Sequence, residues 1–184
     1  MDVVTTELPG LLILQPRIFS DARGFFFELA NRRTLHDCGI ESEFVQDNLS
    51  RSSRGTLRGL HYQIEQTQGK LVTCLAGCVV DVAVDLRRSS PTFGQHAQIE
   101  LSEDTHRMAY IPPGFAHGFC VVSESADFFY KCNDYYAPQH ERTLLWNDPA
   151  LAIDWPTDRF DKSELTLSSK DEAGTPLSDC KTFA

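Results

Sequence analysis

The sequence lacks the long apolar run that a membrane-spanning helix needs. No stretch of about 18 consecutive apolar residues occurs anywhere in it. No charged and then apolar leader precedes the opening residues, Met1 to Val4, so nothing there resembles a secretory signal. From these two absences we expect a soluble, cytoplasmic protein that has no membrane partner.

An excess of positive charge is also missing. The 17 Lys and Arg residues are outnumbered by 26 Asp and Glu residues, and the formal net charge is −9. Because a protein that binds the nucleic-acid backbone needs clustered Lys and Arg, we expect no nucleic-acid partner. A small anionic ligand is still compatible with this composition, since local cations set the field of a pocket.

Cysteine spacings typical of zinc or redox sites are absent as well. The chain has six cysteines, and none of them belongs to a C-x-x-C motif. A chain of 184 residues that is 41% hydrophobic can build a core without disulfides. We therefore expect the cysteines to be small buried hydrophobic residues in one domain over residues 1–184, with roughly the last ten residues flexible.

Short extended runs separated by turn residues make up most of the chain. Turns are expected at Asp21 to Gly24 and at Pro112 to Gly114, and strands over Leu71 to Leu75 and Val79 to Leu86. Many short strands with few helices predict a mainly β fold, a sandwich or barrel, and a jelly roll suits this length.

Two short helices are expected in addition. One covers Asn31 to Cys38 and ends at Gly39, and the other lies near Ser163 to Leu165. Within the predicted strand 79–86, the valines alternate with Asp81 and Asp85, which predicts a wet or functional face on the acidic side.

The segment Leu57 to Gln63 contains an arginine and a histidine that could carry chemistry. A lone histidine in an apolar strand is more often a core histidine whose ring is satisfied by a neighbouring hydroxyl, and this alternative applies to His61. In a regular strand Arg58 and His61 would point to opposite faces, unless Gly59 introduces a bulge that turns both inward.

A second histidine, His117, follows the predicted turn at 112–114 and is flanked by small residues. Two histidines on a β-barrel are similar to the cupin pattern, in which an H-x-H motif helps to hold a divalent metal. Here Gln63 occupies the place of the second histidine of that motif. This favours proton transfer by His61 without metal or cofactor, and a metal-dependent cupin with acidic ligands is the alternative.

Proton transfer that inverts a stereocentre requires an acid facing the base. Tyr130, Tyr135 and Tyr136 are candidates for the acid or for stacking surfaces, and each could instead be a core or rim aromatic residue. Lys70 could stabilise a developing oxyanion, or it could be an exposed turn lysine.

Taken together, the sequence resembles the dTDP-4-dehydrorhamnose 3,5-epimerase family of metal-free cupin enzymes. The resemblance extends from about Val4 to Asp171. The segments that carry it are residues 21–28, 44–48, 57–63, 68–72, 81–87, 113–119 and 144–149.

The resemblance implies a cupin jelly roll that acts on dTDP-4-dehydro-6-deoxy-D-glucose, whose C4 ketone acidifies the hydrogens at C3 and C5. It implies that His61 is the base, that Asp171 orients His61, and that Tyr130 is the acid on the opposite face. Lys70 would stabilise the enolate oxygen. Asp81 is a second carboxylate that could orient His61, and the residues alone do not decide between the two aspartates.

The resemblance also implies the substrate-binding residues: Arg23, Phe26, Glu28, Gln46, Asp47, Asn48, Arg58, His117, Tyr136, Glu141 and Lys170. In the family the segment from Arg23 to Glu28 reaches the site of the partner subunit, so a homodimer is expected. An epimerase that inverts one centre only and a non-catalytic sugar-nucleotide binding module are the remaining alternatives.

Overall fold

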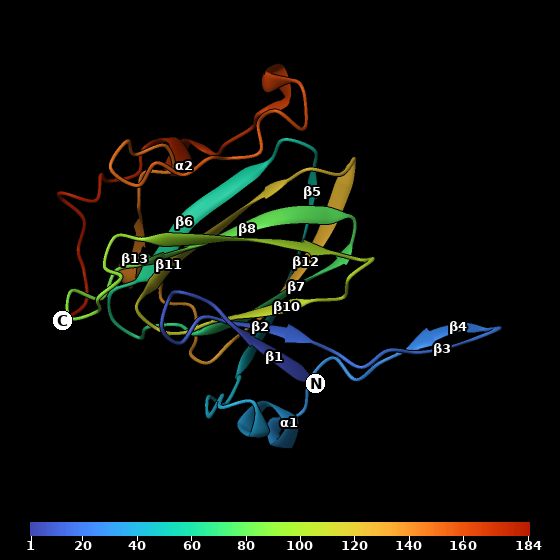
Figure 1. Ribbon diagram of the computed structural model, residues 1–184. Helices are drawn as coiled ribbons and strands as arrows, with labels where there is room; N and C mark the ends of the chain where they lie inside the picture. The colour runs from blue at the N-terminus through green and yellow to red at the C-terminus, as the bar shows by residue number, and fades with distance from the viewer.

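Two antiparallel β-sheets pack face to face in the computed structural model, which describes residues 1–184 (Figure 1). The six-stranded sheet has the order β1 (Asp2–Thr5), β2 (Leu12–Gln15), β10 (Met108–Ile111), β7 (Lys70–Ala76), β12 (Ser125–Cys132) and β5 (Gln46–Ser53). The five-stranded sheet has the order β13 (Glu141–Thr143), β6 (Leu57–Gln63), β11 (Phe115–Val121), β8 (Cys78–Asp85) and β9 (His96–Ser102). A separate hairpin consists of β3 (Phe19–Asp21) and β4 (Gly24–Phe26). The mainly β, cupin-like fold expected from the sequence is confirmed.

The helical segments are few and short. They are α1 (Arg32–Asp37), α2 (Ser169–Glu172) and the 3-10 turns η1 (Pro138–His140) and η2 (Lys162–Glu164). Asn31 caps α1 by accepting a hydrogen bond from the Thr34 amide, and Gly39 follows the helix with a φ of +82°. Both expected helical regions are confirmed, whereas α2 was missed because four residues are too few to show a helical period. None of these helices has the length and apolar character that crossing a membrane requires.

The main hydrophobic core lies between the two sheets. Val72 and Phe128 contribute to it from the six-stranded sheet, and Val79 and Phe119 contribute from the five-stranded sheet. The rings of Phe119 and Phe128 stack with their centroids 4.2 Å apart. This pair joins the two sheets next to the cavity described below, so the core forms part of the floor of the site.

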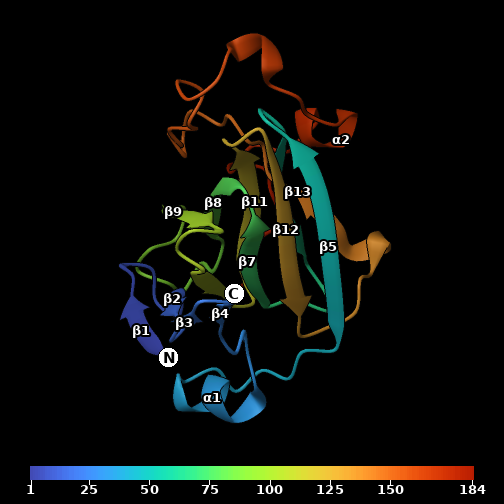
Figure 2. The ribbon, with the colours of Figure 1, turned by 90° about the vertical axis from the view of Figure 1, so that its right-hand side faces the viewer.

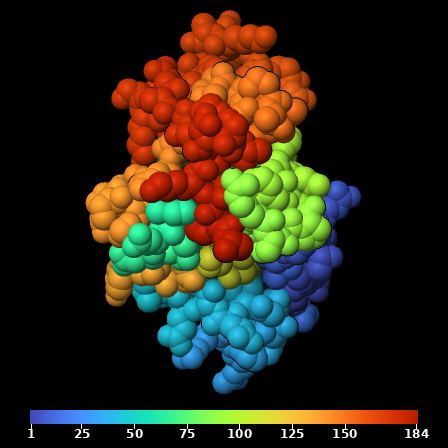
Figure 3. All heavy atoms as spheres, turned by 90° about the vertical axis from the view of Figure 1, so that its left-hand side faces the viewer, coloured from blue at the N-terminus to red at the C-terminus, as the bar shows by residue number.

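A second core covers the outer face of the five-stranded sheet. Val82, Val84 and Leu86 of the β8 region pack there with Trp155 and Cys180 of the C-terminal third of the chain. Figure 3 shows the last residues, in red, lying across this side of the molecule. The expected flexibility of roughly the last ten residues stays a prediction.

The acidic face of β8 is turned toward the interior, because the valine face is occupied by the second core. Asp81 and Asp85 are both completely buried. Of the two alternatives expected from the sequence, a wet face is therefore wrong, and a functional face stays a prediction. Each of these carboxylates instead has a specific buried partner.

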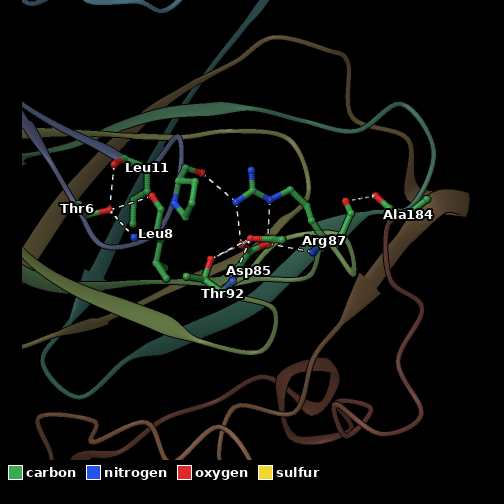
Figure 4. A network of polar contacts seen from close by, with 10 residues as sticks. Thr6, Leu8, Leu11, Asp85, Arg87, Thr92 and Ala184 are labelled. Carbon is green, nitrogen blue, oxygen red and sulfur yellow. Dashed lines mark hydrogen bonds and ion pairs between the residues drawn. The ribbon is translucent and has the colours of Figure 1, made fainter.

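Asp85 is the centre of a polar network that joins three parts of the chain (Figure 4). Its Oδ1 accepts from Arg87 Nε at 2.8 Å, and its Oδ2 accepts from Arg87 Nη2 at 2.7 Å. Ser90 and Thr92 also donate to Oδ2, at 2.6 and 2.8 Å. Arg87 Nη2 in turn donates to the carbonyl oxygen of Pro9 at 2.9 Å. The carboxylate thus fixes the turn after β8 and ties the N-terminal loop to it.

Burial alone would raise the pKa of Asp85, but the hydrogen bonds from Arg87, Ser90 and Thr92 outweigh burial and hold this pKa at about 2. Because the pKa is depressed in the folded state, the carboxylate stabilises the fold at neutral pH. That stabilisation is lost as the pH falls from about 4, the ordinary value, toward 2.

We expect Asp85→Asn to lower the free energy of unfolding at pH 7 by about 3 kcal/mol, since it removes one partner of a buried ion pair. The difference between wild type and variant should shrink as the pH falls toward 2. Urea unfolding at pH 7, 4 and 2.5 measures both effects. The exposed Asp158→Asn is the control, and an equal difference at every pH would contradict the role of the carboxylate charge.

Candidate active site

Arg58 and His61 reach the same cavity because β6 contains one extra residue. His117 of β11 pairs with His61, but Phe119 pairs with Arg58, so two steps along β11 match three steps along β6. Gly59 has a φ of +137°, and a Cβ atom there would lie 2.6 Å from the Cα of Gly118. The bulge at Gly59 considered from the sequence is therefore confirmed, and only glycine permits it.

This cavity has a volume of about 160 Å³ and lies between the two sheets. It is lined by Ser50, Arg58, His61, Lys70, His117, Gly118, Phe119, Phe128 and Tyr130. A larger hollow of about 490 Å³ is lined by residues of the β3–β4 hairpin, and none of the expected proton-transfer residues lines it. The chemistry expected from the sequence is therefore concentrated in the smaller cavity.

His61 is held by a carboxylate that comes from the far end of the chain. His61 Nε2 lies 2.6 Å from Asp171 Oδ1, and Ser168 donates to the other carboxylate oxygen at 2.7 Å. Ser168 also caps α2, since its hydroxyl accepts a hydrogen bond from the Asp171 amide at 3.2 Å. The start of α2 therefore fixes the carboxylate against the imidazole.

Asp171 is ionised throughout the physiological range. Burial would raise its pKa, but the hydrogen bonds from His61 and Ser168 outweigh burial and hold the pKa at about 2. An ionised carboxylate at Nε2 favours the tautomer in which Nε2 carries the hydrogen. The lone pair of neutral His61 is then on Nδ1, which gives the ring a basic nitrogen.

Asp81 has a different histidine partner. Its Oδ2 lies 2.7 Å from His117 Nε2, so Asp171, not Asp81, contacts His61. Burial lowers the pKa of His117, and the charges of Lys70 and His61 add to this effect, whereas Asp81 opposes it. The second carboxylate oxygen of Asp81 is buried without a hydrogen-bond partner.

Lys70 begins β7 and lies at the cavity rather than in an exposed turn. Its ammonium group has no hydrogen bond or ion pair within the chain, so its donors are free for a ligand. Burial lowers the pKa of Lys70, and the charges of Cys132, Asp81 and Glu141 oppose this effect. The alternative of an exposed turn lysine is wrong.

Tyr130 on β12 also lines the cavity. Burial raises the pKa of its phenol, an effect to which Cys132 adds and which Arg58 opposes. The group therefore stays protonated at neutral pH and can donate a proton. No side chain or backbone group of the chain accepts a hydrogen bond from it.

The residues expected at the nucleotide end form a connected group. Tyr136 donates its amide hydrogen to Gln46 Oε1 at 2.9 Å and its hydroxyl hydrogen to Glu141 Oε2 at 2.9 Å. Lys170 pairs with Glu141 at 2.6 Å, and Gln46 donates to Asn48 at 3.0 Å. This group lies next to the cavity. Cys132 on β12 pairs with Gln46 on one neighbouring strand and with Lys70, a cavity residue, on the other.

Four expected binding residues lie away from this group. Asp47 faces the opposite side of β5 and pairs with Lys131 at 2.6 Å. Arg23 and Phe26 lie on the β3–β4 hairpin, which extends away from the sandwich in Figure 1, and Phe26 is 70% exposed. Glu28 accepts hydrogen bonds from Asn31 and Thr34 at the start of α1.

Ser50 and Ser168 were not anticipated as site residues. Ser50 lines the cavity from β5, and the sequence carries no clear signal for it, because polar residues stand at 47, 51 and 53 as well as at 46, 48, 50 and 52. The sequence signal for Ser168 is a serine followed by an aspartate three residues later, Asp171. A serine in this position is typical of the N-terminal cap of a helix. Nowhere in the chain do three or more His, Cys, Asp or Glu side chains gather as a metal site would require.

The chain is similar to known proteins along nearly its whole length. A family model described as dTDP-4-dehydrorhamnose 3,5-epimerase matches residues 5–179. A protein of that name from Pseudomonas aeruginosa is 52% identical over 184 residues, which is 100% of this chain and 99% of the relative.

Solved structures are similar along nearly the whole chain. A dTDP-6-deoxy-D-glucose-3,5-epimerase from Legionella pneumophila, in complex with dTDP-4-keto-L-rhamnose, has a TM-score of 0.93 and 50% identity, covering 98% of this chain and 94% of its own. A 3'-monoepimerase from Streptomyces bikiniensis, in complex with dTDP-quinovose, has a TM-score of 0.86 and 31% identity, covering 94% and 86%. By the extent of the family match and these identities, the chain belongs to the dTDP-4-dehydrorhamnose 3,5-epimerase family.

Proposed function

We propose that this chain inverts C3 and C5 of dTDP-4-dehydro-6-deoxy-D-glucose and so gives dTDP-4-dehydro-L-rhamnose, in the biosynthesis of dTDP-L-rhamnose. The observation that carries the proposal is the cavity in which His61, held by Asp171, lies with Lys70 and Tyr130. A binding module has no need for a base, an oriented carboxylate and a protonated phenol in one cavity. The reaction class is therefore acid–base isomerisation.

The C4 ketone makes the hydrogens at C3 and C5 acidic. Nδ1 of His61 takes the proton from carbon, and the electron pair of that C–H bond moves to the C4 oxygen as an enolate. The ammonium of Lys70 stabilises the negative oxygen, because a desolvated cation interacts strongly with charge that develops beside it. Tyr130 then returns a proton to the opposite face of the carbon, which inverts the centre, and solvent restores both side chains.

The remaining cavity residues bind the sugar nucleotide in this proposal. The planar guanidinium of Arg58 suits a diphosphate oxygen pair, and His117 contacts the sugar beside it. Tyr136 stacks beside the base, while Gln46, Asn48, Glu141 and Lys170 hold the nucleotide end. Asp47 takes part only through its backbone, since its side chain is paired with Lys131 on the other face.

We further infer that the protein is a homodimer in which the β3–β4 hairpin reaches the partner's cavity. The hairpin exposes Arg23 and two phenylalanines, Phe25 and Phe26, and lies away from the cavity of its own chain. Glu28 at the base of the hairpin is close to α1 rather than to His61. These residues match substrate-binding positions of the family but do not reach the cavity of their own chain. In this proposal they reach the cavity of a second copy.

A cytoplasmic location is part of the same proposal. All six cysteines are free thiols, and four of them are buried. Free thiols persist in reducing compartments, whereas oxidising compartments favour disulfides.

Two alternatives are separated by experiment. A single-centre epimerase would use the same groups, and the similarity to the 3'-monoepimerase is the reason to consider it. The sequence identity to the 3,5-epimerase, 50%, is higher than the identity to the 3'-monoepimerase, 31%. A metal-dependent cupin would use His61 and His117 with acidic ligands, and independence from metal stays a prediction.

We expect wild-type protein treated with chelator to incorporate deuterium at both C3 and C5 in D₂O. His61→Ala should lose exchange at both carbons by about 10²- to 10⁴-fold, because the base is removed. Tyr130→Phe should retain exchange but lose inversion, since the proton is still abstracted but is not returned to the other face. Proton NMR of the keto sugar measures all of these outcomes, and exchange at one carbon only would indicate the single-centre alternative.

We expect Asp171→Asn to lower kcat by about a hundredfold or more, because an amide can donate to Nε2 and so favours the wrong tautomer of His61. The neighbouring Glu172 is exposed, which makes Glu172→Gln the matched control. Thermal unfolding of both variants checks the fold. An Asp171→Asn enzyme within a factor of about two of wild type would exclude the orienting role.

Mixing two inactive variants tests the contribution of the hairpin to the partner's site. In a random mixture of Arg23→Ala and His61→Ala chains, each heterodimer has one cavity with both residues intact, which restores about a quarter of wild-type activity. If Arg23 acts within its own chain, no cavity is complete and the mixture stays inactive. Sedimentation of the wild-type chain measures the dimer itself.

A further inference from the structure

One face of β5 presents a row of short polar side chains to the interior. Figure 2 shows β5 and β12 side by side along one edge of the sandwich. Residues 46, 48, 50 and 52 face inward, while Asp47, Leu49 and Arg51 face outward and are exposed. Ser50 lies directly opposite Phe128, which itself lines the cavity.

Three of the four inward side chains have partners within the chain. Gln46 bonds with Asn48 and with the Tyr136 amide, and Asn48 lies 3.8 Å from Cys132 Sγ. Ser52 accepts a hydrogen bond from Arg58 Nε at 3.1 Å. The hydroxyl of Ser50 is buried and has no partner at all. A buried hydroxyl without a partner is unfavourable, and Ser50 lines the cavity, so Ser50 is the position of this row at which a ligand atom would supply the missing hydrogen bond.

The other groups of the cavity limit what that atom can be. Arg58 and Lys70 can only donate hydrogen bonds, which suits phosphate and ketone oxygens. His117 is engaged by Asp81, and His61 and Tyr130 carry the proposed proton transfers. A sugar hydroxyl needs an acceptor as well as a donor, and the Ser50 oxygen serves as both.

We propose that Ser50 recognises a ring hydroxyl of the hexose, at C2 or C3 beside the reacting carbons, and determines specificity for it. This inference rests on the proposed function and adds a residue that contacts the substrate. Loss of one neutral hydrogen bond predicts a change in kcat/KM of about three- to tenfold.

A cycle of variants and substrates tests the contact. Wild type and Ser50→Ala are compared on dTDP-4-dehydro-6-deoxy-D-glucose and on its 2-deoxy and 3-deoxy analogues, with deuterium entry at C5 as the common readout. The variant should lose activity on the full substrate and on one analogue, but not on the analogue that lacks the recognised hydroxyl. Its affinity for dTDP alone should equal that of wild type.

Ser53→Ala is the matched control, because Ser53 is exposed on the same strand. An equal loss on all three substrates, a weaker affinity for dTDP, or no loss at all would each overturn the contact. Failure of the proposed function is separate, since an inert wild-type protein overturns both inferences, whereas an active wild type with an unaffected Ser50→Ala overturns only this one.

Discussion

The close approach of β6 to β11 at two glycines is the constraint on which the site depends. A Cβ atom on Gly118 would lie 2.5 Å from the carbonyl oxygen of Arg58 and 2.9 Å from the Cα of Gly59. With glycine at both positions the strands come together, and β6 takes up its extra residue there. If β6 paired regularly with β11, without this bulge, Arg58 and His61 would point to opposite faces of the sheet, and only one of the two could reach the cavity.

The two histidines of the cavity have the same kind of partner but different surroundings. Each lies within 2.7 Å of an aspartate oxygen, yet the side chain of His61 is 27% exposed and that of His117 is 7% exposed. The more accessible ring can exchange protons with a ligand and with solvent. The buried ring is held neutral by its surroundings, which suits binding rather than proton transfer.

Hydrogen-bond donors and carboxylates also lie at different depths of the site. Arg58, Lys70 and the Tyr130 phenol present donors to the cavity, whereas Asp81 and Asp171 lie behind the histidines. This arrangement concentrates donors where an anionic sugar nucleotide and its enolate would lie, although the chain as a whole has a net charge of −9. Asp85, four residues from Asp81 on the same face of β8, instead stabilises the turn after β8 through Arg87.

The sequence by itself determined the features that depend on local pattern. Alternation and turn residues predicted the strands, Gly39 predicted the end of α1, and the ordered motifs identified the family. Only the tertiary structure decided that Asp171 rather than Asp81 contacts His61. Asp171 and His61 are 110 positions apart in the chain, and no local pattern relates them. The tertiary structure alone also showed that the acidic face of β8 is buried and that the Ser50 hydroxyl lacks a partner. Burial and hydrogen bonding depend on which distant segments pack against a strand, and that information is absent from the strand's own residues.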